Sequence, residues 1–332
     1  MKPEIKAKLI SIGKINIDEV SIDNLRLGYS ASGPGAGSES IFIKKGGKRV
    51  RLTIAKDSPL ILKENEIIME DEIIIDKFEL EEPILHCPKQ AYITVDASCI
   101  FDCKFCPVPK LKGENRSVEK VLDMIRSASK NKEFSAISLT SGVPKDPREE
   151  VIKLAKIIRL AKEEFNVPIG VSPYSAGNEG TDLLYSAGAD EIKYNIESYD
   201  QEIFKRTCKD LSLDEIIDSL KYAVEVFGEN KVTSNMIIGL GESDETVIEG
   251  IEHLASIGVI PILRALVISP LRRGDLMRST DNRASRPSAD RLLRLAIAQK
   301  EILDSYGLKM DKPKTMCPPC TGCDLTPHRD IL

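Results

Sequence analysis

Short apolar runs alternate with longer periodic segments between residues 89 and 307. The short runs are rich in Val, Ile and Leu, as in buried strands, whereas apolar residues in the periodic segments return every three or four positions, as on one helix face. The predicted strands are residues 91–95, 136–140, 168–172, 191–196, 232–240 and 260–268. A predicted helix follows each strand, so the pattern indicates repeated βα units and a parallel sheet.

Capping residues mark several of these helices. Ser212 and Glu215 stand at the spacing of a capping box, and Gly228 ends the same helix. The other helices are predicted to begin near Ser117, after Pro147 and at Ser288, and to end at Gly188, near Gly258 and at Gly307. Six units rather than eight predict an α/β fold whose sheet curls into an open, partial barrel. Functional residues of such sheets gather at the C-terminal ends of the strands.

Residues 1–86 are predicted to form a small β-rich module of strands and tight turns. Residues 40–54 have the pattern of a hairpin that turns at Gly46 and Gly47. The glycine-rich stretch 27–40 is predicted to be a surface or lid loop, since it lacks the strand–loop–helix context of a phosphate cradle. The predicted organisation is therefore module 1–86, barrel 87–307 and cysteine-rich tail 308–332.

The charge balance argues against several classes of partner. The 332 residues include 47 Lys and Arg against 52 Asp and Glu, a net charge of −5, which disfavours nucleic acid and membrane surfaces as partners. No apolar run approaches the ~20 residues that span a bilayer, and the first residues lack the pattern of a signal peptide. We therefore expect a cytoplasmic protein, in which clustered cysteines indicate metal more often than disulfides.

Six of the eight cysteines fall into two groups of three. Cys99, Cys103 and Cys106 follow the first predicted strand, Cys317, Cys320 and Cys323 lie near the C-terminus, and Cys87 and Cys208 are isolated. The first spacing, C-x3-C-x2-C, lets one loop place three thiolates around a four-iron cluster and leaves the fourth iron open. A zinc site is the alternative, but no further Cys or His follows Cys106 within about twenty residues, and zinc would need one.

This motif, in the loop after strand one of a six-unit barrel, resembles that of the radical S-adenosylmethionine (SAM) enzymes. The resemblance covers roughly residues 89–275. It implies a partial (β/α)6 TIM-like barrel and a 4Fe–4S cluster whose open iron binds SAM. Reductive cleavage of SAM would then yield a 5′-deoxyadenosyl radical that abstracts hydrogen from carbon, and the barrel would position and shield these cofactors.

The resemblance also assigns SAM contacts at the ends of three strands. It places the methionyl amino group at Thr140, Ser141 and Gly142, in a Thr-Ser form of the motif that looks like that of lipoyl synthases. It implies binding of the ribose or methionyl part by Asn195 and Glu197, of the carboxylate by Arg206, and of the adenosine near Gly239 and Gly241. Phe105, which precedes the last cysteine of the loop, is assigned to the cofactor as well.

The cysteines of the tail predict a second, auxiliary iron–sulfur cluster, with structural zinc as the alternative. Cys317, Cys320 and Cys323 have the C-x2-C-x2-C spacing that opens a ferredoxin pattern, but the position of the fourth cysteine is Pro327. The fourth ligand is left open among His328, Cys208, a non-cysteine group and Cys87. Cys87 is disfavoured because it precedes strand one, unless the tail runs underneath the barrel. The ten residues after Gly307 reach at most ~35 Å, so the tail is expected to fold back over the barrel mouth.

Lipoyl and biotin synthases use an auxiliary cluster as a sulfur donor, so the resemblance implies sulfur insertion, most plausibly into an octanoyl chain carried by a protein. The layout is similar to archaeal biotin-synthase-related proteins, including two-protein lipoyl synthases. The implied partners are SAM, an electron donor such as ferredoxin or flavodoxin, an acyl-carrying domain and a second radical SAM protein. Arg264, Arg272 and Arg273 are interpreted either as contacts for a carboxylate or acidic carrier, or as surface arginines.

Three other functions remain open. The tail cluster could relay electrons or anchor a substrate during peptide or cofactor maturation. The enzyme could transfer methyl groups or catalyse a rearrangement with a structural tail, although no cobalamin module is recognisable. Outside catalysis, the chain could be a zinc-stabilised binding module, against which the intact motifs argue.

Overall fold

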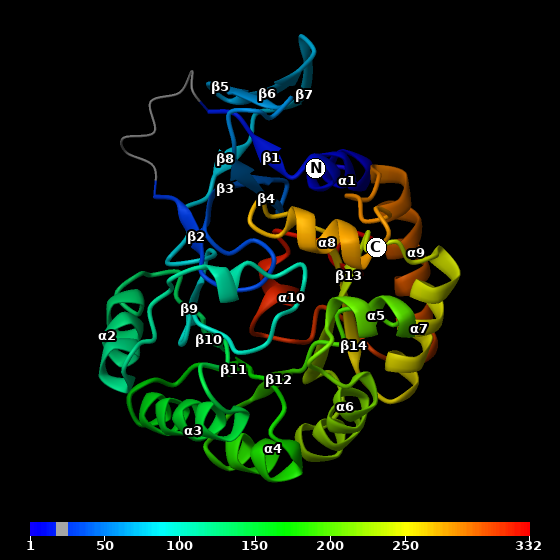
Figure 1. The fold of residues 1–332 in the computed structure, drawn as a ribbon. Coiled ribbons are helices and arrows are strands. Elements are labelled where there is room, and N and C mark those ends of the chain that lie inside the picture. The colour runs from blue at the N-terminus through cyan, green and yellow to red at the C-terminus, as the bar shows by residue number, and fades with distance from the viewer. Residues whose placement is uncertain (18–25) are drawn as a thin grey trace.

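The computed structural model describes residues 1–17 and 26–332, and its centre is a six-stranded parallel sheet (Figure 1). Its order is β14-β13-β12-β11-β10-β9, so each unit adds the next strand alongside the last. The strands are β9 (Gln90–Thr94), β10 (Ala136–Thr140), β11 (Ile169–Ser172), β12 (Glu191–Lys193), β13 (Val232–Ile238) and β14 (Ile260–Ala265). In the described chain β9 and β14 do not pair with each other, so the sheet stays open. The predicted partial barrel is confirmed.

Helices surround this sheet on its outer side (Figure 1). They are α2 (Val118–Ala128), α3 (Pro147–Glu164), α4 (Gly177–Ser186), α6 (Leu213–Phe227), α7 (Asp244–Ser256) and α9 (Ala289–Ser305). The capping box forms as predicted, since the Ser212 side chain accepts a hydrogen bond from the Glu215 N–H. Two short helices were not predicted, α5 (Gln201–Thr207) and α8 (Arg273–Ser279). None of the described helices is long and apolar enough to cross a membrane.

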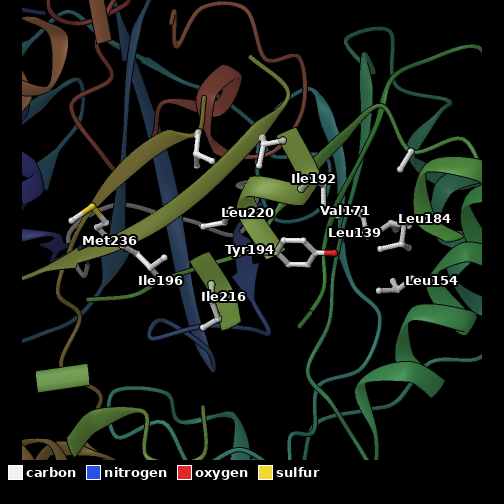
Figure 2. Close-up of a cluster of buried hydrophobic side chains, with 14 of the residues drawn as sticks. Leu139, Leu154, Val171, Leu184, Ile192, Tyr194, Ile196, Ile216, Leu220 and Met236 are labelled. Atoms are coloured by element: carbon white, nitrogen blue, oxygen red, sulfur yellow. The ribbon is translucent and has the colours of Figure 1, made fainter. Parts of the chain in front are cut away.

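The core of the barrel lies between the strands and the helices (Figure 2). Leu139, Val171 and Ile192 come from successive strands and are at most 1% exposed. Their contacts with the helices explain why the strands appear in the sequence as short apolar runs without alternation.

The N-terminal segment begins with a helix, where the sequence pattern predicts only strands. Helix α1 (Pro3–Ile12) has a proline in its first turn and ends at Gly13, whose φ of 67° lets it cap the C-terminus. Seven strands follow, β1 (Lys14–Ile15), β2 (Gly28–Ser30), β3 (Ser38–Lys45), β4 (Lys48–Ile54), β5 (Ile61–Lys63), β6 (Glu66–Met69) and β7 (Glu72–Asp76), with a short β8 (Glu79–Leu80). The predicted hairpin joins β3 to β4 through Gly46 and Gly47, both with positive φ. The prediction for residues 18–25 lies outside the described residues.

A second core joins this segment to the barrel. It contains Ile41 and Leu52 of the hairpin together with Leu292 and Ala296 of α9 and Leu325 of the tail. The last barrel helix and the tail are therefore packed directly against the N-terminal sheet.

The tail enters the barrel at the N-terminal ends of the strands. The prediction that it covers the barrel mouth, at the C-terminal ends, is therefore wrong. The Met316 N–H donates to Gln90 Oε1 and to Ser138 Oγ, both at 2.9 Å. The Glu191 carboxylate accepts the N–H groups of Lys314 at 2.6 Å and of Thr315 at 2.9 Å. Gln90 and Glu191 are the first residues of β9 and β12, so these contacts lie at the N-terminal ends of the strands. Beyond them, α10 (Cys317–Cys320) lies inside the ring of strands (Figure 1).

We predict that Gly170→Ala displaces the tail. A Cβ on Gly170 in β11 would lie 1.9 Å from Thr315 Oγ1, so the tail must shift. The free energy of unfolding should fall by about 1–3 kcal/mol, as for overpacked cores, and proteases should cut the tail faster. Gly274→Ala is the control, because its nearest neighbour is the end of the Arg278 side chain at 3.5 Å. Equal stability and proteolysis in both variants would contradict this path of the tail.

Candidate active site and a second group of thiols

The first cysteine group lies in the loop after β9, and backbone hydrogen bonds fix this loop to its neighbours. Asp96 O accepts from Gly142 N–H at 2.7 Å and the Ile100 N–H donates to Val143 O at 2.8 Å, which ties the loop to the end of β10. On the other side, Lys104 N–H donates to Thr207 O at 2.8 Å. These backbone hydrogen bonds hold the loop between the end of β10 and α5.

The three thiols are partly buried and near one another. Burial raises the pKa of the Cys106 thiol to about 12 and also raises that of Cys99. The pKa of Cys103 is also raised, first by a hydrogen bond with the Cys208 thiol and then by burial. Binding of an iron–sulfur cluster at these thiols would therefore release protons. Cys208 belongs beside this group and not beside the tail.

Arg272 is bonded to the backbone and to one side chain of the cysteine loop. Its side chain is only 1% exposed, so it is neither a surface arginine nor free to meet a carrier protein. Its guanidinium donates to Cys106 O at 2.7 Å, to Asp275 at 3.0 Å and to Asp102. Arg273, by contrast, is exposed.

The Thr-Ser-Gly segment after β10 lies directly against the cysteine loop. Ser141 Oγ donates to Gly142 O at 2.8 Å and accepts from Asp96 N–H at 3.3 Å. A Cβ on Gly142 would lie 2.2 Å from Ser98 O, so only glycine fits there. Thr140 is the last residue of β10, so all three residues lie at the C-terminal end of the sheet.

Asn195 and Glu197 lie at the same end, after β12. Glu197 has a φ of 58° and bridges to β13, where it donates to Asn235 O and accepts from Ile237 N–H. Asn195 Oδ1 accepts from Asn235 N–H at 3.2 Å. Burial raises the pKa of Glu197 to about 7, and its charge contributes to the raised pKa values of Cys103 and Cys106. The structure thus brings Glu197 close to the cysteine loop.

The other predicted SAM contacts have structural partners of their own. Arg206 makes a bidentate ion pair with Asp281 at 2.5 Å, on a partly exposed surface. Gly239 and Gly241 have positive φ, and a Cβ on Gly239 would lie 2.1 Å from Ser285 O. Phe105 is 3% exposed and packs in the barrel core. Arg206, Gly239 and Phe105 thus contact Asp281, Ser285 and the barrel core, and not Glu197.

Glu150 is a buried carboxyl group that sequence reasoning missed. It is 3% exposed in the first turn of α3, and burial raises its pKa to about 8, with a further contribution from Asp96. Its burial could have been predicted from the sequence, because Glu150 lies on the apolar face of α3, one turn before Leu154 and two turns before Ile158.

The cysteines of the tail form a second group within the barrel. The Cys320 thiol is hydrogen-bonded to Cys87, and this contact lowers the pKa of Cys320 to about 6. Lys193 Nζ lies 3.9 Å from Cys317 Sγ. The Arg264 guanidinium bonds to the Cys323 thiol and to Asp324, so Arg264 faces the tail and not a carrier protein.

His328 does not lie with these thiols. Its Nδ1 accepts from Met310 N–H and its Nε2 contacts Asp304, both at 3.1 Å. Across the described ranges, no three His, Cys, Asp or Glu side chains converge as the ligands of a single metal ion. Zinc draws its sulfur ligands to about 2.3 Å, so a preformed zinc site is not found in those ranges.

We predict that Arg272→Met loosens the cysteine loop. The change leaves the Cys106 carbonyl without its donor and removes the ion pairs with Asp102 and Asp275. Because Asp102 is 39% exposed, the expected cost is that of a lost buried hydrogen bond, about 1–3 kcal/mol. Iron bound after reconstitution and desalting should fall, together with the melting temperature. The exposed neighbour supplies the control, Arg273→Met, for which both quantities should stay near those of the parent. An Arg272→Met protein that matches its control would show that Arg272 does not support the loop.

We predict that Glu150→Gln stabilises the metal-free protein as pH rises. The unfolded chain loses this proton near pH 4.5 but the folded chain keeps it up to about pH 8, so stability falls between these values. Each unit of raised pKa is worth about 1.4 kcal/mol. Denaturant unfolding at pH 5 and pH 8 should show a gain for Glu150→Gln only at pH 8. The exposed Glu149→Gln is the control, and an equal effect at both pH values would contradict the assignment.

Comparison with known proteins agrees with this geometry. Residues 94–254 match the family described as the radical SAM superfamily. The chain is 26% identical to a biotin synthase of Persephonella marina, over 46% of each chain. It is 24% identical to a lipoyl synthase of Picrophilus torridus, over 57% of this chain and 69% of that one. The chain spans about half the length of the biotin synthases it matches.

Solved structures share the fold at low identity. The FeFe-hydrogenase maturase HydG from Carboxydothermus hydrogenoformans superposes with a TM-score of 0.51 at 18% identity, over 65% of this chain and 52% of that one. A radical SAM methyltransferase from Sphaerobacter thermophilus gives 0.50 at 15% identity, over 86% and 76%. The chain is thus similar to the radical SAM superfamily over residues 94–254 and distantly similar to biotin and lipoyl synthases, and the solved structures share its fold.

Proposed function

We propose that the chain is a radical SAM enzyme whose cluster is held by Cys99, Cys103 and Cys106. The observation that carries this proposal is the placement of three thiols in a braced loop at the C-terminal end of the sheet. That loop lies beside Gly142 and Glu197, the residues that the resemblance assigns to SAM. When bound, the reduced cluster would supply the electron that cleaves SAM to a 5′-deoxyadenosyl radical. An external donor such as ferredoxin or flavodoxin would reduce it.

The residues around the loop would position SAM. Oxygen atoms of the Thr140–Gly142 segment are acceptors for its ammonium group, and Asn195 and Glu197 offer polar groups to its ribose or methionyl part. Arg206 would have to exchange Asp281 for the SAM carboxylate. Gly239, Gly241 and Phe105 would shape the adenosine side of the site.

We further propose that the enzyme inserts sulfur, with an octanoyl chain on a protein as the substrate. The tail thiols lie inside the same barrel and would hold a second iron–sulfur cluster, the sulfur source. The similarity to biotin and lipoyl synthases supports this choice of chemistry. An acyl-carrying domain and a second radical SAM protein are the partners this function would require. None of the eight cysteines is paired in a disulfide, and we propose a cytoplasmic location.

We predict that the two thiol groups have separable effects on activity. The protein would be reconstituted without oxygen, reduced, and supplied with SAM and an octanoyl-lysine peptide. The parent should form 5′-deoxyadenosine and thiolated peptide while it loses acid-labile sulfide. The Cys99/Cys103/Cys106→Ala variant should form neither product, whereas Cys317/Cys320/Cys323→Ala should keep SAM cleavage and lose thiolation.

Two results would contradict the proposal at different levels. Absence of 5′-deoxyadenosine from the reconstituted parent would refute the radical SAM activity. Turnover with an unchanged sulfide content would refute sulfur donation and indicate an electron relay or substrate anchor.

A further inference from the structure

We infer that Cys87 is the fourth ligand of the tail cluster, so that Cys87, Cys317, Cys320 and Cys323 form a four-thiolate iron–sulfur site. This inference rests on the proposed second cluster but not on the role of that cluster in catalysis. It assigns a ligand far from the other three in sequence, in the turn that precedes the first barrel strand.

The side chain of Cys87 already lies with the tail thiols. It is 0% exposed, and its thiol is hydrogen-bonded to Cys320. The charge of Cys317 also contributes to the raised pKa of Cys87. Cys87 and Cys320 pack together with Phe42 and Tyr92 in a small buried cluster.

The backbone holds Cys87 in register with the tail. Three residues after Cys87, the side chain of Gln90 accepts from Met316 N–H and donates to Met316 O, each at 2.9 Å. The turn that carries Cys87 is thus bonded to the residue just before Cys317. Because the tail enters at the N-terminal ends of the strands, the position of Cys87 before β9 favours its role as a ligand.

The loop from Cys320 to Cys323 is fixed from the opposite side by the N-terminal module. The Arg51 N–H donates to Gly322 O and Lys6 Nζ donates to Thr321 O, both at 2.6 Å. A Cβ on Gly322 would lie 2.9 Å from the Phe42 ring, so the loop is closely packed against β3. The site therefore joins three parts of the chain, namely the N-terminal sheet, the barrel and the tail.

Buried and half-buried cations lie around the four thiols. Lys193, 3% exposed, approaches Cys317, and Arg264 bonds to Cys323. Arg49, 7% exposed, donates to Cys320 O at 2.7 Å, and its charge acts on Cys320 and Cys87. Four thiolates around a cluster carry a net negative charge that must be compensated in a buried site, and these cations supply the compensation.

With four protein ligands, this cluster would differ from the first in having no open coordination position. Four cysteines complete the ligand set of a 4Fe–4S cluster, which leaves no iron open for SAM. We therefore expect SAM to perturb the spectrum of the Cys99/Cys103/Cys106 cluster and not that of the tail cluster.

The test isolates the tail cluster and then removes Cys87. In a Cys99/Cys103/Cys106→Ala background, anaerobic reconstitution should leave about four irons per chain. Adding Cys87→Ala should lower the iron and acid-labile sulfide contents and change or abolish the EPR signal of the reduced protein. Cys208→Ala is the matched control, because Cys208 is as buried as Cys87 but lies beside Cys103. It should leave all three readouts unchanged.

The outcomes separate this inference from the proposed function. A background that binds no iron would overturn the second cluster and, with it, the four-thiolate site. About four irons and an unaltered EPR signal in Cys87→Ala would overturn the role of Cys87 alone. If Cys87→Ala melts well below the background before reconstitution, Cys87→Ser replaces it. A changed or lost EPR signal in Cys87→Ser supports ligation, and an unchanged one overturns it.

Discussion

The hydrogen bonds between the tail backbone and the lower end of the barrel determine where every cysteine of the second group lies. Gln90 binds both backbone groups of Met316, Ser138 adds a second acceptor for its N–H, and Glu191 accepts from Lys314 and Thr315. Gln90, Ser138 and Glu191 are buried, and a buried polar group without a partner costs about 1–3 kcal/mol. A tail outside the barrel would leave the Glu191 carboxylate and the Gln90 amide N–H without these partners, while Ser138 would still donate to Gln90 Oε1, so the threaded path is favoured.

Strand β12 connects this lower anchor to the candidate active site. Glu191 at its start binds the tail, Lys193 at its end approaches Cys317, and Glu197 just beyond it acts on the pKa values of Cys103 and Cys106. Within residues 191–197, side chains therefore bind the tail, approach the second thiol group and act electrostatically on the first. Strand β12 and the residues after it thus add to the contacts that place both groups of thiols, and a rigid element of this kind can hold two cofactors in a fixed relation.

Local signals in the sequence were sufficient for the barrel but not for the tail. Apolar runs, the Ser212 capping box and the Gly46–Gly47 turn involve neighbours within a few residues, so the strands, α6 and the hairpin could be predicted. The resemblance of the cysteine loop to that of radical SAM enzymes likewise depends on a local motif, and it led to the candidate site at Cys99, Cys103 and Cys106. The path of the tail depends on the bonds between Gln90 and Met316, 226 residues apart, for which no local pattern exists.

The burial of charged residues was the other feature that the sequence did not predict. Arg272 appears in the sequence as one of two adjacent arginines, and only the distant Cys106 carbonyl shows why it is buried while its neighbour is exposed. Helix α1 is different, because Pro3 and Gly13 are ordinary helix signals. They were outweighed by the strand patterns that follow in the same module.

The central claim is that two iron–sulfur clusters share one barrel interior, and EPR of the doubly reconstituted, reduced protein tests it most directly. The spectrum and its power saturation would be compared with the sum of the spectra from the Cys99/Cys103/Cys106→Ala and Cys317/Cys320/Cys323→Ala variants. Two clusters in one interior should relax each other magnetically, so the parent should saturate less readily than that sum. A parent spectrum equal to the sum at every power would place the clusters apart and contradict the account.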